Sequence, residues 1–209
     1  CYSDLLRQAL GVLKNSNTLV VKGSAGTGKT TMVKELLSYF KVEDKFKICC
    51  TAPTNKAVLV LKNKTDKEEY DYRTVHSALC LKAKYTKKGI EFAPDKTAKF
   101  PPLYQVGVLV VDEASMLDST TIGYIREAAK KEGTKVIYLG DDKQINPVGE
   151  TNSPVFNLGY PQVELTEIIR QKNTNPIVDL SRNLPQIFKK EDNRTEVGGY
   201  IYTSDIDKV

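Results

Sequence analysis

Gly23-Ser24-Ala25-Gly26-Thr27-Gly28-Lys29-Thr30 decides the fold of this chain, because it matches the phosphate-binding pattern GxxxxGK[ST]. The run Thr18-Leu19-Val20-Val21 before it is apolar and β-branched, which is typical of a buried parallel strand. Residues 31–37 after it place apolar side chains on one face of a helix. A glycine-rich turn between such a strand and helix gathers backbone N–H groups and the positive end of a helix dipole around one anion. The stretch therefore predicts a nucleotide-phosphate site.

The motif also assigns roles to its own residues. Lys29 would reach the β- and γ-phosphates of the nucleotide, and Thr30 would hold Mg²⁺. The alternative is a glycine-rich turn that fits the pattern by chance, and the flanking strand and helix argue against it. The residues expected to bind the nucleotide are Gly23, Ser24, Ala25, Gly26, Thr27, Gly28, Lys29, Thr30 and Thr31.

Length and composition fit one α/β domain with a small insertion. The chain has 209 residues, of which 40% are hydrophobic and 27% are charged. Its net charge of +5 is weak support for a polyanionic partner. No apolar run is long enough for a membrane span, and no signal peptide is visible. The four cysteines form no CxxC pair, which favours reduced and mostly buried thiols over a metal site.

Strands that alternate with helices predict an α/β fold, with a parallel sheet covered by helices on both faces. Ligands bind such sheets at the carboxyl ends of the strands. Further strands are expected at 46–51, 106–111, 135–139 and 163–166. Helices are expected at 2–14, from the phosphate loop to near Phe40, and at 57–61, 74–81, 118–133 and 175–184, with a charged, solvated loop at 62–73.

Two acids directly follow the apolar strand at 106–111. Asp112 and Glu113 would be costly at the end of a buried strand unless a cation lay beside them, and Mg²⁺ provides that cation. Asp112 would then belong to the coordination shell of the metal, and Glu113 would orient and deprotonate the attacking water. An exposed acidic turn is the alternative. An acid directly after the metal-binding acid favours hydrolysis over phosphoryl transfer to a small metabolite.

Three further positions carry weaker signals. Gln144 follows the strand at 135–139 and could hydrogen-bond a γ-phosphate or the water, but a solvated turn explains it equally well. Thr54 lies at a strand-to-helix junction and could bind an external phosphate, but helix capping is the simpler explanation. His76 is the only histidine, and a lone histidine is usually structural.

Residues 82–102 differ in composition from the rest of the chain. Six lysines face two acids there, so six minus two leaves +4 of the total charge of +5. Three aromatic residues are interleaved with the lysines. Lys88-Gly89 predicts a turn between two short extended runs, so we expect an inserted β-hairpin.

Taken together, six motifs in this order resemble the first motor lobe of superfamily 1 DNA helicases of the RecD/Dda type, and those of T-even phages most. The motifs lie at 23–30, 51–57, 74–77, 112–116, 140–148 and 165–171. The resemblance implies a RecA-like P-loop lobe. That lobe would comprise residues 1–81 and 103–209, with the hairpin at 82–102 as an insertion and the second motor lobe absent from this chain.

The resemblance also implies an ATP-dependent DNA helicase that moves 5′ to 3′ along single-stranded DNA, with ATP and Mg²⁺ as cofactors. Gln144 would sense the γ-phosphate, and Arg170 would be an arginine finger. Catalytic roles are implied for Lys29, Glu113, Gln144 and Arg170, and metal binding for Thr30 and Asp112. Contacts to single-stranded DNA are implied for Pro53, Thr54, Asn55, Thr74, His76, Asn146 and Pro147.

The hairpin corresponds to the wedge, or pin, of this family. Its lysines would attract phosphates, and an aromatic side chain could stack on a base at the fork. We expect Phe92 to be the wedge residue; the alternative is that Phe92 packs the hairpin onto the lobe. The implied partners are single-stranded DNA, the fork junction and proteins of DNA replication, repair or recombination. A monomer without membrane contact is expected, in the cytoplasm of a bacterial or phage-infected cell.

Three other functions remain open. Another P-loop enzyme would not need the elements around Thr54 and His76, and Asn55-Lys56 lacks the aspartate of the base-reading element of a GTPase. A non-motor ATP switch would bind nucleic acid without steady turnover, and an RNA helicase would be activated by RNA. Because superfamily 1 motors cleave ATP between two lobes, we expect the isolated chain to be nearly inactive.

Overall fold

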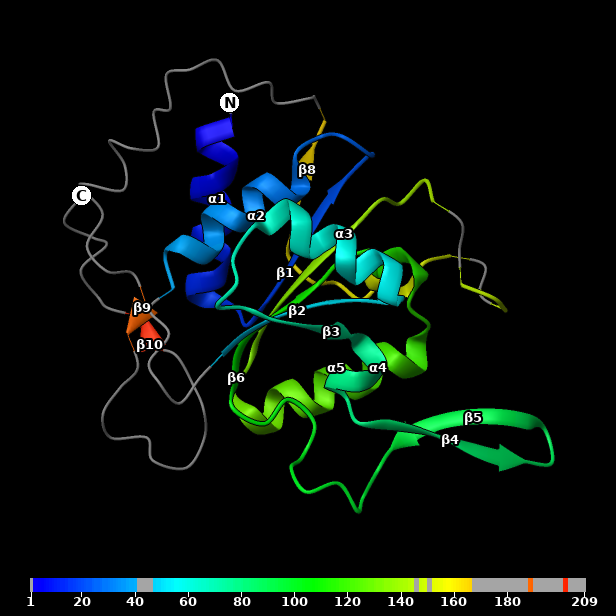
Figure 1. The fold of residues 1–209 in the computed structure, drawn as a ribbon. Helices are drawn as coiled ribbons and strands as arrows, with labels where there is room; N and C mark the ends of the chain where they lie inside the picture. Colours follow the sequence, from blue (N-terminus) through cyan, green and yellow to red (C-terminus); the bar gives the residue numbers. More distant parts are fainter. Residues whose placement is uncertain are drawn as a thin grey trace.

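The six-stranded sheet at the centre of the fold is parallel throughout (Figure 1). Its strand order is β3-β2-β6-β7-β1-β8, which confirms the predicted α/β class. The strands are β1 (Thr18–Gly23), β2 (Lys47–Ala52), β3 (Asp71–Thr74), β6 (Val106–Val111), β7 (Lys135–Gly140) and β8 (Gln162–Leu165). The computed structural model describes residues 2–40, 47–144, 147–149 and 152–166, and the backbone of 188–189 and 201–202.

Helices cover both faces of this sheet (Figure 1). They are α1 (Tyr2–Asn15), α2 (Lys29–Ser38), α3 (Asn55–Thr65), α4 (Val75–Ala78) and α5 (Ser119–Glu132). The first three pack on one face and the last two on the other, and β6 is buried at every position. Among the described helices, none has the length and apolar character of a membrane span.

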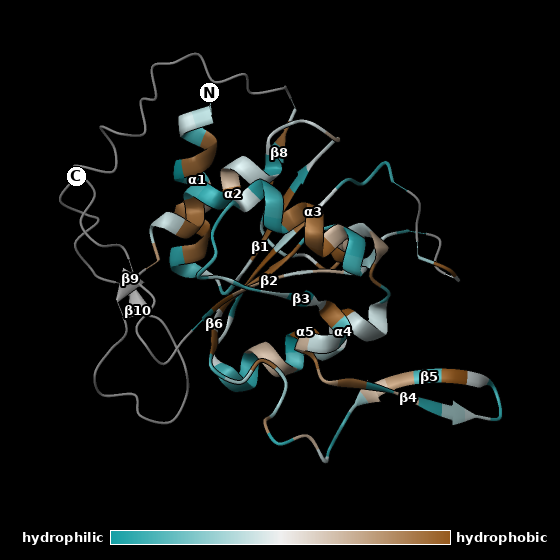
Figure 2. Ribbon diagram, in the orientation of Figure 1, coloured by the Kyte–Doolittle hydropathy of each residue, from teal (hydrophilic) through white to brown (hydrophobic). Residues whose placement is uncertain are grey.

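Side-chain alternation along the strands builds a separate core on each face. Cys49 and Cys50 are neighbours on β2, and they belong to opposite cores, as predicted. Figure 2 shows hydrophobic residues concentrated on the central strands and hydrophilic residues on the outer faces of the helices. The sheet therefore separates two apolar layers, which is why its strands read as continuous apolar runs.

Short polar side chains begin α4 and α5, and a glycine ends α5. The Asp118 carboxylate accepts the Thr121 N–H at 2.8 Å at the start of α5. The Thr74 hydroxyl accepts the Ser77 N–H at 3.2 Å at the start of α4. Gly133 ends α5 with a φ of 68°, a left-handed conformation that a residue without Cβ adopts freely.

The predicted loop at 62–73 is wrong in part, because α3 continues to Thr65 and β3 begins at Asp71. Thr65 is fully buried, and its hydroxyl hydrogen-bonds the Leu61 carbonyl at 2.9 Å and the Tyr72 hydroxyl at 2.5 Å. These contacts join the end of the helix to the edge strand. The charged residues between them are exposed. Because they outnumber the buried positions, the hydrophobic pattern of this segment does not reveal which residues are buried.

The inserted hairpin is present but shorter than predicted. Its strands β4 (Leu81–Thr86) and β5 (Gly89–Pro94) form a separate antiparallel sheet that extends away from the rest of the fold (Figure 1). Only the first part of the predicted segment 82–102 is therefore paired. Residues 95–105 form turns that return the chain to β6.

Two predicted helices have different outcomes. The helix expected at 74–81 is α4, which ends at Ala78 because Cys80, with a φ of 51°, turns the chain into β4. The helix expected at 175–184 lies outside the described residues. Further along the chain, a second antiparallel pair joins β9 (Phe188–Lys189) and β10 (Ile201–Tyr202).

The cap of α5 gives a stability prediction. Asp118→Ala removes the acceptor of the Thr121 N–H and is expected to lower the free energy of unfolding by about 1 kcal/mol. For a domain of this size the midpoint of thermal unfolding should fall by roughly 2–4 °C. Urea and thermal unfolding, followed by circular dichroism, measure both quantities. Asp118→Asn is the matched control because asparagine also caps helices, and equal losses in both variants would contradict the capping role.

Candidate nucleotide site and nucleic-acid interface

The carboxyl ends of three strands converge on a cleft of about 850 Å³, a volume typical of small-molecule sites. The phosphate loop follows β1, two acids follow β6, and residues 140–144 follow β7. Because β7 pairs with both β6 and β1, these segments meet at one edge of the sheet. The cleft lining includes Ala25, Gly26, Gly28, Lys29, Thr30, Thr31, Asp112, Glu113, Asp141 and Gln144. The cleft thus brings together the predicted metal residues, the described catalytic residues and most of the predicted nucleotide residues, while Gly23, Ser24 and Thr27 of the same loop do not line it.

Close packing and backbone conformation explain two glycines of the phosphate loop. A Cβ on Gly23 would lie 2.6 Å from the Thr27 hydroxyl oxygen and 2.8 Å from the Leu165 carbonyl oxygen, so no larger residue fits. Gly28 has a φ of 93° immediately before α2. The loop therefore leads directly into the amino end of a ten-residue helix, where backbone N–H groups and the helix dipole favour an anion.

The Lys29 ammonium lies over the phosphate loop. It donates to the carbonyl oxygens of Gly23 at 2.5 Å and Ser24 at 2.9 Å. Burial lowers the pKa of Lys29, while the carboxylates of Asp141 and Asp112 raise it. A phosphate in the cleft would add a further negative charge beside the amine and favour its protonated form.

Asp112 is a half-buried acid of the cleft, which is also lined by the buried Asp141. Burial raises the pKa of its carboxyl group, while the hydrogen bond from the Glu113 N–H (2.8 Å) and the charges of Lys64 and Lys29 lower it. A half-buried carboxylate fits Mg²⁺, which takes one or two carboxylates and completes its shell with phosphate oxygens and water. Thr30 lines the same cleft, so the donors expected for this ion are together.

Glu113 has an uncommon backbone conformation. Its φ of 51° is left-handed, and it begins the short 3₁₀ helix η1 (Ala114–Met116). Non-glycine residues in this region carry local strain and are enriched at functional sites. The strained turn places Glu113 on the cleft wall directly beside Asp112.

Ser115 orients the amide of Gln144. Its hydroxyl donates to Gln144 Oε1 at 3.1 Å, while Ser115 itself is fully buried. An amide whose oxygen accepts from a hydroxyl keeps its NH₂ group available to donate elsewhere. Ser115 lies in the motif at 112–116, but the sequence assigns it no role because its partner lies 29 positions away.

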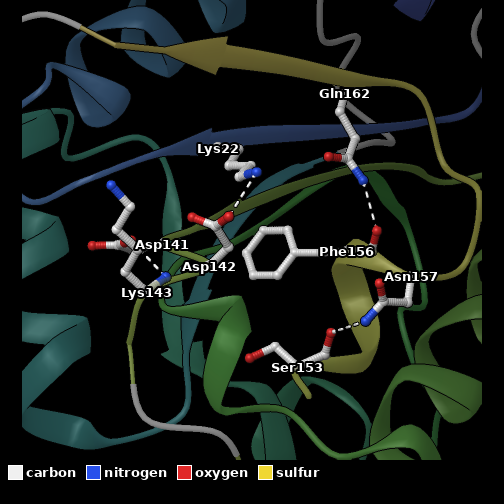
Figure 3. Close-up of polar contacts among 8 residues, drawn as sticks. All are labelled: Lys22, Asp141, Asp142, Lys143, Ser153, Phe156, Asn157 and Gln162. Atoms are coloured by element: carbon white, nitrogen blue, oxygen red, sulfur yellow. Dashed lines mark hydrogen bonds and ion pairs between the residues drawn. The ribbon is translucent and has the colours of Figure 1, made fainter.

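A second set of contacts fixes the 140–144 segment (Figure 3). Lys22 and Asp142 form an ion pair at 2.7 Å. A Cβ on Gly140 would lie only 2.7 Å from Cζ of Phe156, which shows how closely this ring covers β7. Phe156 belongs to the 3₁₀ helix η2 (Pro154–Phe156). The segment that carries Gln144 is thus tied to both β1 and η2.

Two lysines of the cleft were missed by sequence reasoning. Lys64 and Lys67 line it from the end of α3 and the turn that follows. Both fall in the stretch predicted to be a solvated loop. Their sequence context is a run of exposed charges, which offers no signal that would have distinguished them.

The predicted nucleic-acid residues at the carboxyl ends of β2 and β3 lie side by side. Ala52 of β2 pairs with Thr74 of β3, so the Pro53-Thr54-Asn55 stretch leaves the sheet beside Thr74. The Thr54 hydroxyl accepts the Ala57 N–H at 3.2 Å, and Thr54 and Asn55 are exposed. Both threonines therefore cap helices at the same sheet edge as the cleft, which makes a DNA contact geometrically feasible and leaves it a prediction.

His76 and Phe92 lie against each other, with ring centroids 4.7 Å apart. Phe92 pairs with Ala83 in the hairpin register, so it sits towards the hairpin base instead of the turn. Tyr85 lies one pair before the last, Thr86–Gly89, and is 85% exposed. Tyr85 and its cross-strand partner Ile90 are therefore the exposed large hydrophobic side chains of the hairpin strands that lie nearest the tip.

The remaining predicted site residues lie at the margin of the described structure. Arg170 and Asn146 are outside the described residues. Pro147 is described and buried.

The sequence matches a family described as an AAA domain over residues 6–199. It is 30% identical to the ATP-dependent DNA helicase dda of Enterobacteria phage T4 over 83% of this chain and 39% of that protein. It is 27% identical to the RecBCD enzyme subunit RecD of Buchnera aphidicola over 86% of this chain and 32% of that protein. The chain thus spans about a third of the length of these curated relatives.

The crystal structure of Pif1 helicase from Candida albicans has the same fold. It superposes with a TM-score of 0.53 at 21% identity, over 86% of this chain and 43% of that chain. The resemblance of the six motifs to superfamily 1 helicases is confirmed by the sequence relatives. The chain belongs to the AAA domain family and corresponds to the first motor lobe of the superfamily 1 helicases RecD, Dda and Pif1.

Proposed function

We propose that this chain is the ATP-binding motor lobe of a DNA helicase that moves 5′ to 3′ along single-stranded DNA. One observation carries the proposal: the cleft with Lys29, Asp112 and Gln144 opens at the same sheet edge as the Thr54 and Thr74 caps. Parallel strands place all of these groups at their carboxyl ends. A structural change caused by ATP binding or hydrolysis could therefore reach DNA bound at Thr54 and Thr74 through the strands of the sheet.

The proposal gives five residues of the cleft a role in ATP hydrolysis. Lys29 would hold the β- and γ-phosphates, and Thr30 and Asp112 would hold Mg²⁺, which neutralises the charge that develops on the phosphates. Glu113 would orient the attacking water and accept its proton, and Gln144 would donate to the γ-phosphate or the water. Arg170 is proposed as an arginine finger from the resemblance alone.

The proposed partners follow from this activity. Single-stranded DNA would cross the surface of Thr54, Thr74 and His76, and the hairpin would meet the fork junction. We propose a monomer that works in the cytoplasm with proteins of replication or recombination. The lobe would comprise residues 1–81 and 103–209, with the hairpin region as an insertion.

ATP hydrolysis by the full-length protein tests the proposal. We expect strong stimulation by single-stranded DNA, and we expect Lys29→Ala to abolish it because the phosphates lose their amine. Assays without nucleic acid, with DNA and with single-stranded RNA separate the alternatives. Stimulation by RNA alone would indicate an RNA helicase, and hydrolysis that ignores both would contradict a motor. Nucleotide-dependent DNA binding without turnover would indicate a switch.

The Ser115 contact gives a second prediction. Ser115→Ala should lower kcat by about threefold to tenfold, the value of one lost hydrogen bond, because the Gln144 amide loses its orientation. KM for ATP should stay nearly constant, since the phosphate loop is untouched. Ser115→Thr keeps the hydroxyl and should restore most of kcat. A Thr variant as slow as the Ala variant would place the effect in packing instead.

The hairpin gives a third prediction. Tyr85→Ala should slow strand separation severalfold while DNA-stimulated ATP hydrolysis is retained, because Tyr85 is exposed near the turn and contributes a stacking surface. Phe92→Ala should slow strand separation and also change the stimulation by DNA, because Phe92 contacts His76. Unwinding of a forked duplex and ATPase assays measure both effects. Normal unwinding by both variants would rule out the hairpin as a wedge.

A further inference from the structure

The hairpin has two chemically different faces. Alternate residues of an antiparallel pair point to opposite sides, and directly paired residues share a side. One face carries Leu81, Ala83 and Tyr85 with their partners Pro94, Phe92 and Ile90. The other face carries Lys82 and Lys84 with their partners Ala93 and Glu91. One side is therefore apolar and aromatic, and the other, called the basic face below, carries two lysines and one glutamate.

The two faces lead to different parts of the lobe. On the apolar face, Phe92 contacts His76, beside the surface proposed for the tracked single strand. On the basic face, Lys82 forms an ion pair with Asp95 at 2.6 Å. Asp95 begins the segment 95–105, so this ion pair joins the basic face of the hairpin to that segment.

A cavity of about 380 Å³ lies where this segment meets the edge strand β3 and the starts of β2 and β6. Its charged side chains are Lys47, Arg73, Lys99 and Asp71, three cations and one anion. Arg73 hydrogen-bonds Asp71, and the two lysines are exposed. The cavity is separate from the nucleotide cleft, and its net positive charge favours an anionic ligand.

Two aromatic rings form part of the cavity wall. Phe100 and Tyr104 stack with centroids 4.6 Å apart and ring planes 10° apart, and they remain 48% and 43% exposed. Lys99 lies over the Phe100 ring at 5.4 Å. Exposed stacked rings with cations beside them are the elements with which proteins bind single-stranded nucleic acid without sequence preference.

The backbone around the cavity is held in a defined shape. Cys80, Leu103 and Gln105 have left-handed φ values of 51°, 60° and 57°, although none of them is glycine. The Lys47 N–H donates to the Gln105 carbonyl at 2.8 Å, and the Leu103 N–H donates to the Ala78 carbonyl at 3.3 Å. Such strained residues persist where the surrounding structure fixes them, and they occur often at binding sites. The stacked pair Phe100 and Tyr104, called the platform below, is therefore formed before any ligand binds. This reduces the entropic cost of binding.

We propose that this cavity binds the displaced strand, the one on which the motor does not move. One base stacks on the Phe100–Tyr104 platform, and the neighbouring phosphates lie against Lys47, Lys99 and Arg73. The hairpin would separate the two strands, its apolar face next to the tracked strand and its basic face next to the displaced one. This inference rests on the proposed helicase function.

The test compares two forked DNA substrates that differ only in a single-stranded tail on the displaced strand. Fluorescence anisotropy with the full-length protein measures the Kd of each. We expect the tailed fork to bind about tenfold more tightly, as one stacked base and its phosphate contacts allow. The double variant Phe100→Ala/Tyr104→Ala should remove this preference while ATP hydrolysis stimulated by single-stranded DNA stays within about twofold of wild type.

A second variant keeps the test decisive if the first does not fold. Lys47→Gln/Lys99→Gln should also remove the preference for the tail and reduce its dependence on salt concentration. The matched control is Lys130→Gln/Lys131→Gln, which removes two exposed lysines of α5 and should leave the preference intact. A photoreactive 5-iodouracil in the tail should crosslink to Phe100 or Tyr104, and the same group in the tracked strand should not.

The outcomes distinguish this inference from the function on which it rests. Equal Kd values for the two forks in the wild-type protein, or an unchanged preference in both cavity variants, would overturn a displaced-strand site. A wild-type protein that single-stranded DNA fails to stimulate would contradict the helicase proposal, and the fork comparison would still report whether the cavity binds a strand.

Discussion

The pairing of β7 with both β6 and β1 is the constraint on which the candidate site depends. Backbone hydrogen bonds set the register, so that Val111, the last residue of β6, lies opposite Tyr138, and Lys22 lies opposite Gly140. The segments that leave these three strands have no freedom to separate. The anion-binding loop, the acidic pair and the amide therefore meet in one cleft, although Gly23 and Gln144 are 121 positions apart in the chain.

Burial gives that cleft its electrostatic character. It lowers the pKa of Lys29 and raises that of Asp112, so each charged form is disfavoured when considered alone. The Lys29 ammonium and the Asp112 carboxylate reduce this cost for one another, and a nucleotide with its metal would reduce it further. The cleft is thus arranged for a ligand that carries both negative phosphates and a divalent cation.

The sequence predicted those parts of the fold whose signal is local. The strand that ends in Asp112, the helix capped by Asp118 and the phosphate loop were all found, because each combines an apolar run with a cap or turn residue. Thr65 and Tyr72 were missed because their burial comes from a contact among exposed charges. Such positions depend on packing, which no local pattern encodes.

The same limit applies to the site. Lys29, Thr30, Asp112 and Glu113 could be identified because the motif places each at a strand end. Ser115 and Lys64 could not, since their roles come from partners that only the fold brings close. Phe92 illustrates the intermediate case: composition predicted the hairpin, but only the register shows that its ring lies at the base beside His76.

The separate two-stranded sheet of the hairpin has a mechanical consequence. It behaves as a cantilever about 20 Å long, the length of a six-residue strand, which is attached to the lobe at one end. A force on the turn near Tyr85 produces its largest torque at the attachment. Two contacts of Phe92 resist this torque. Its ring contacts His76, and its carbonyl accepts a hydrogen bond from the Tyr124 hydroxyl at 3.3 Å. If the hairpin opens a duplex, the opposing force would therefore be transmitted to His76 through its contact with Phe92.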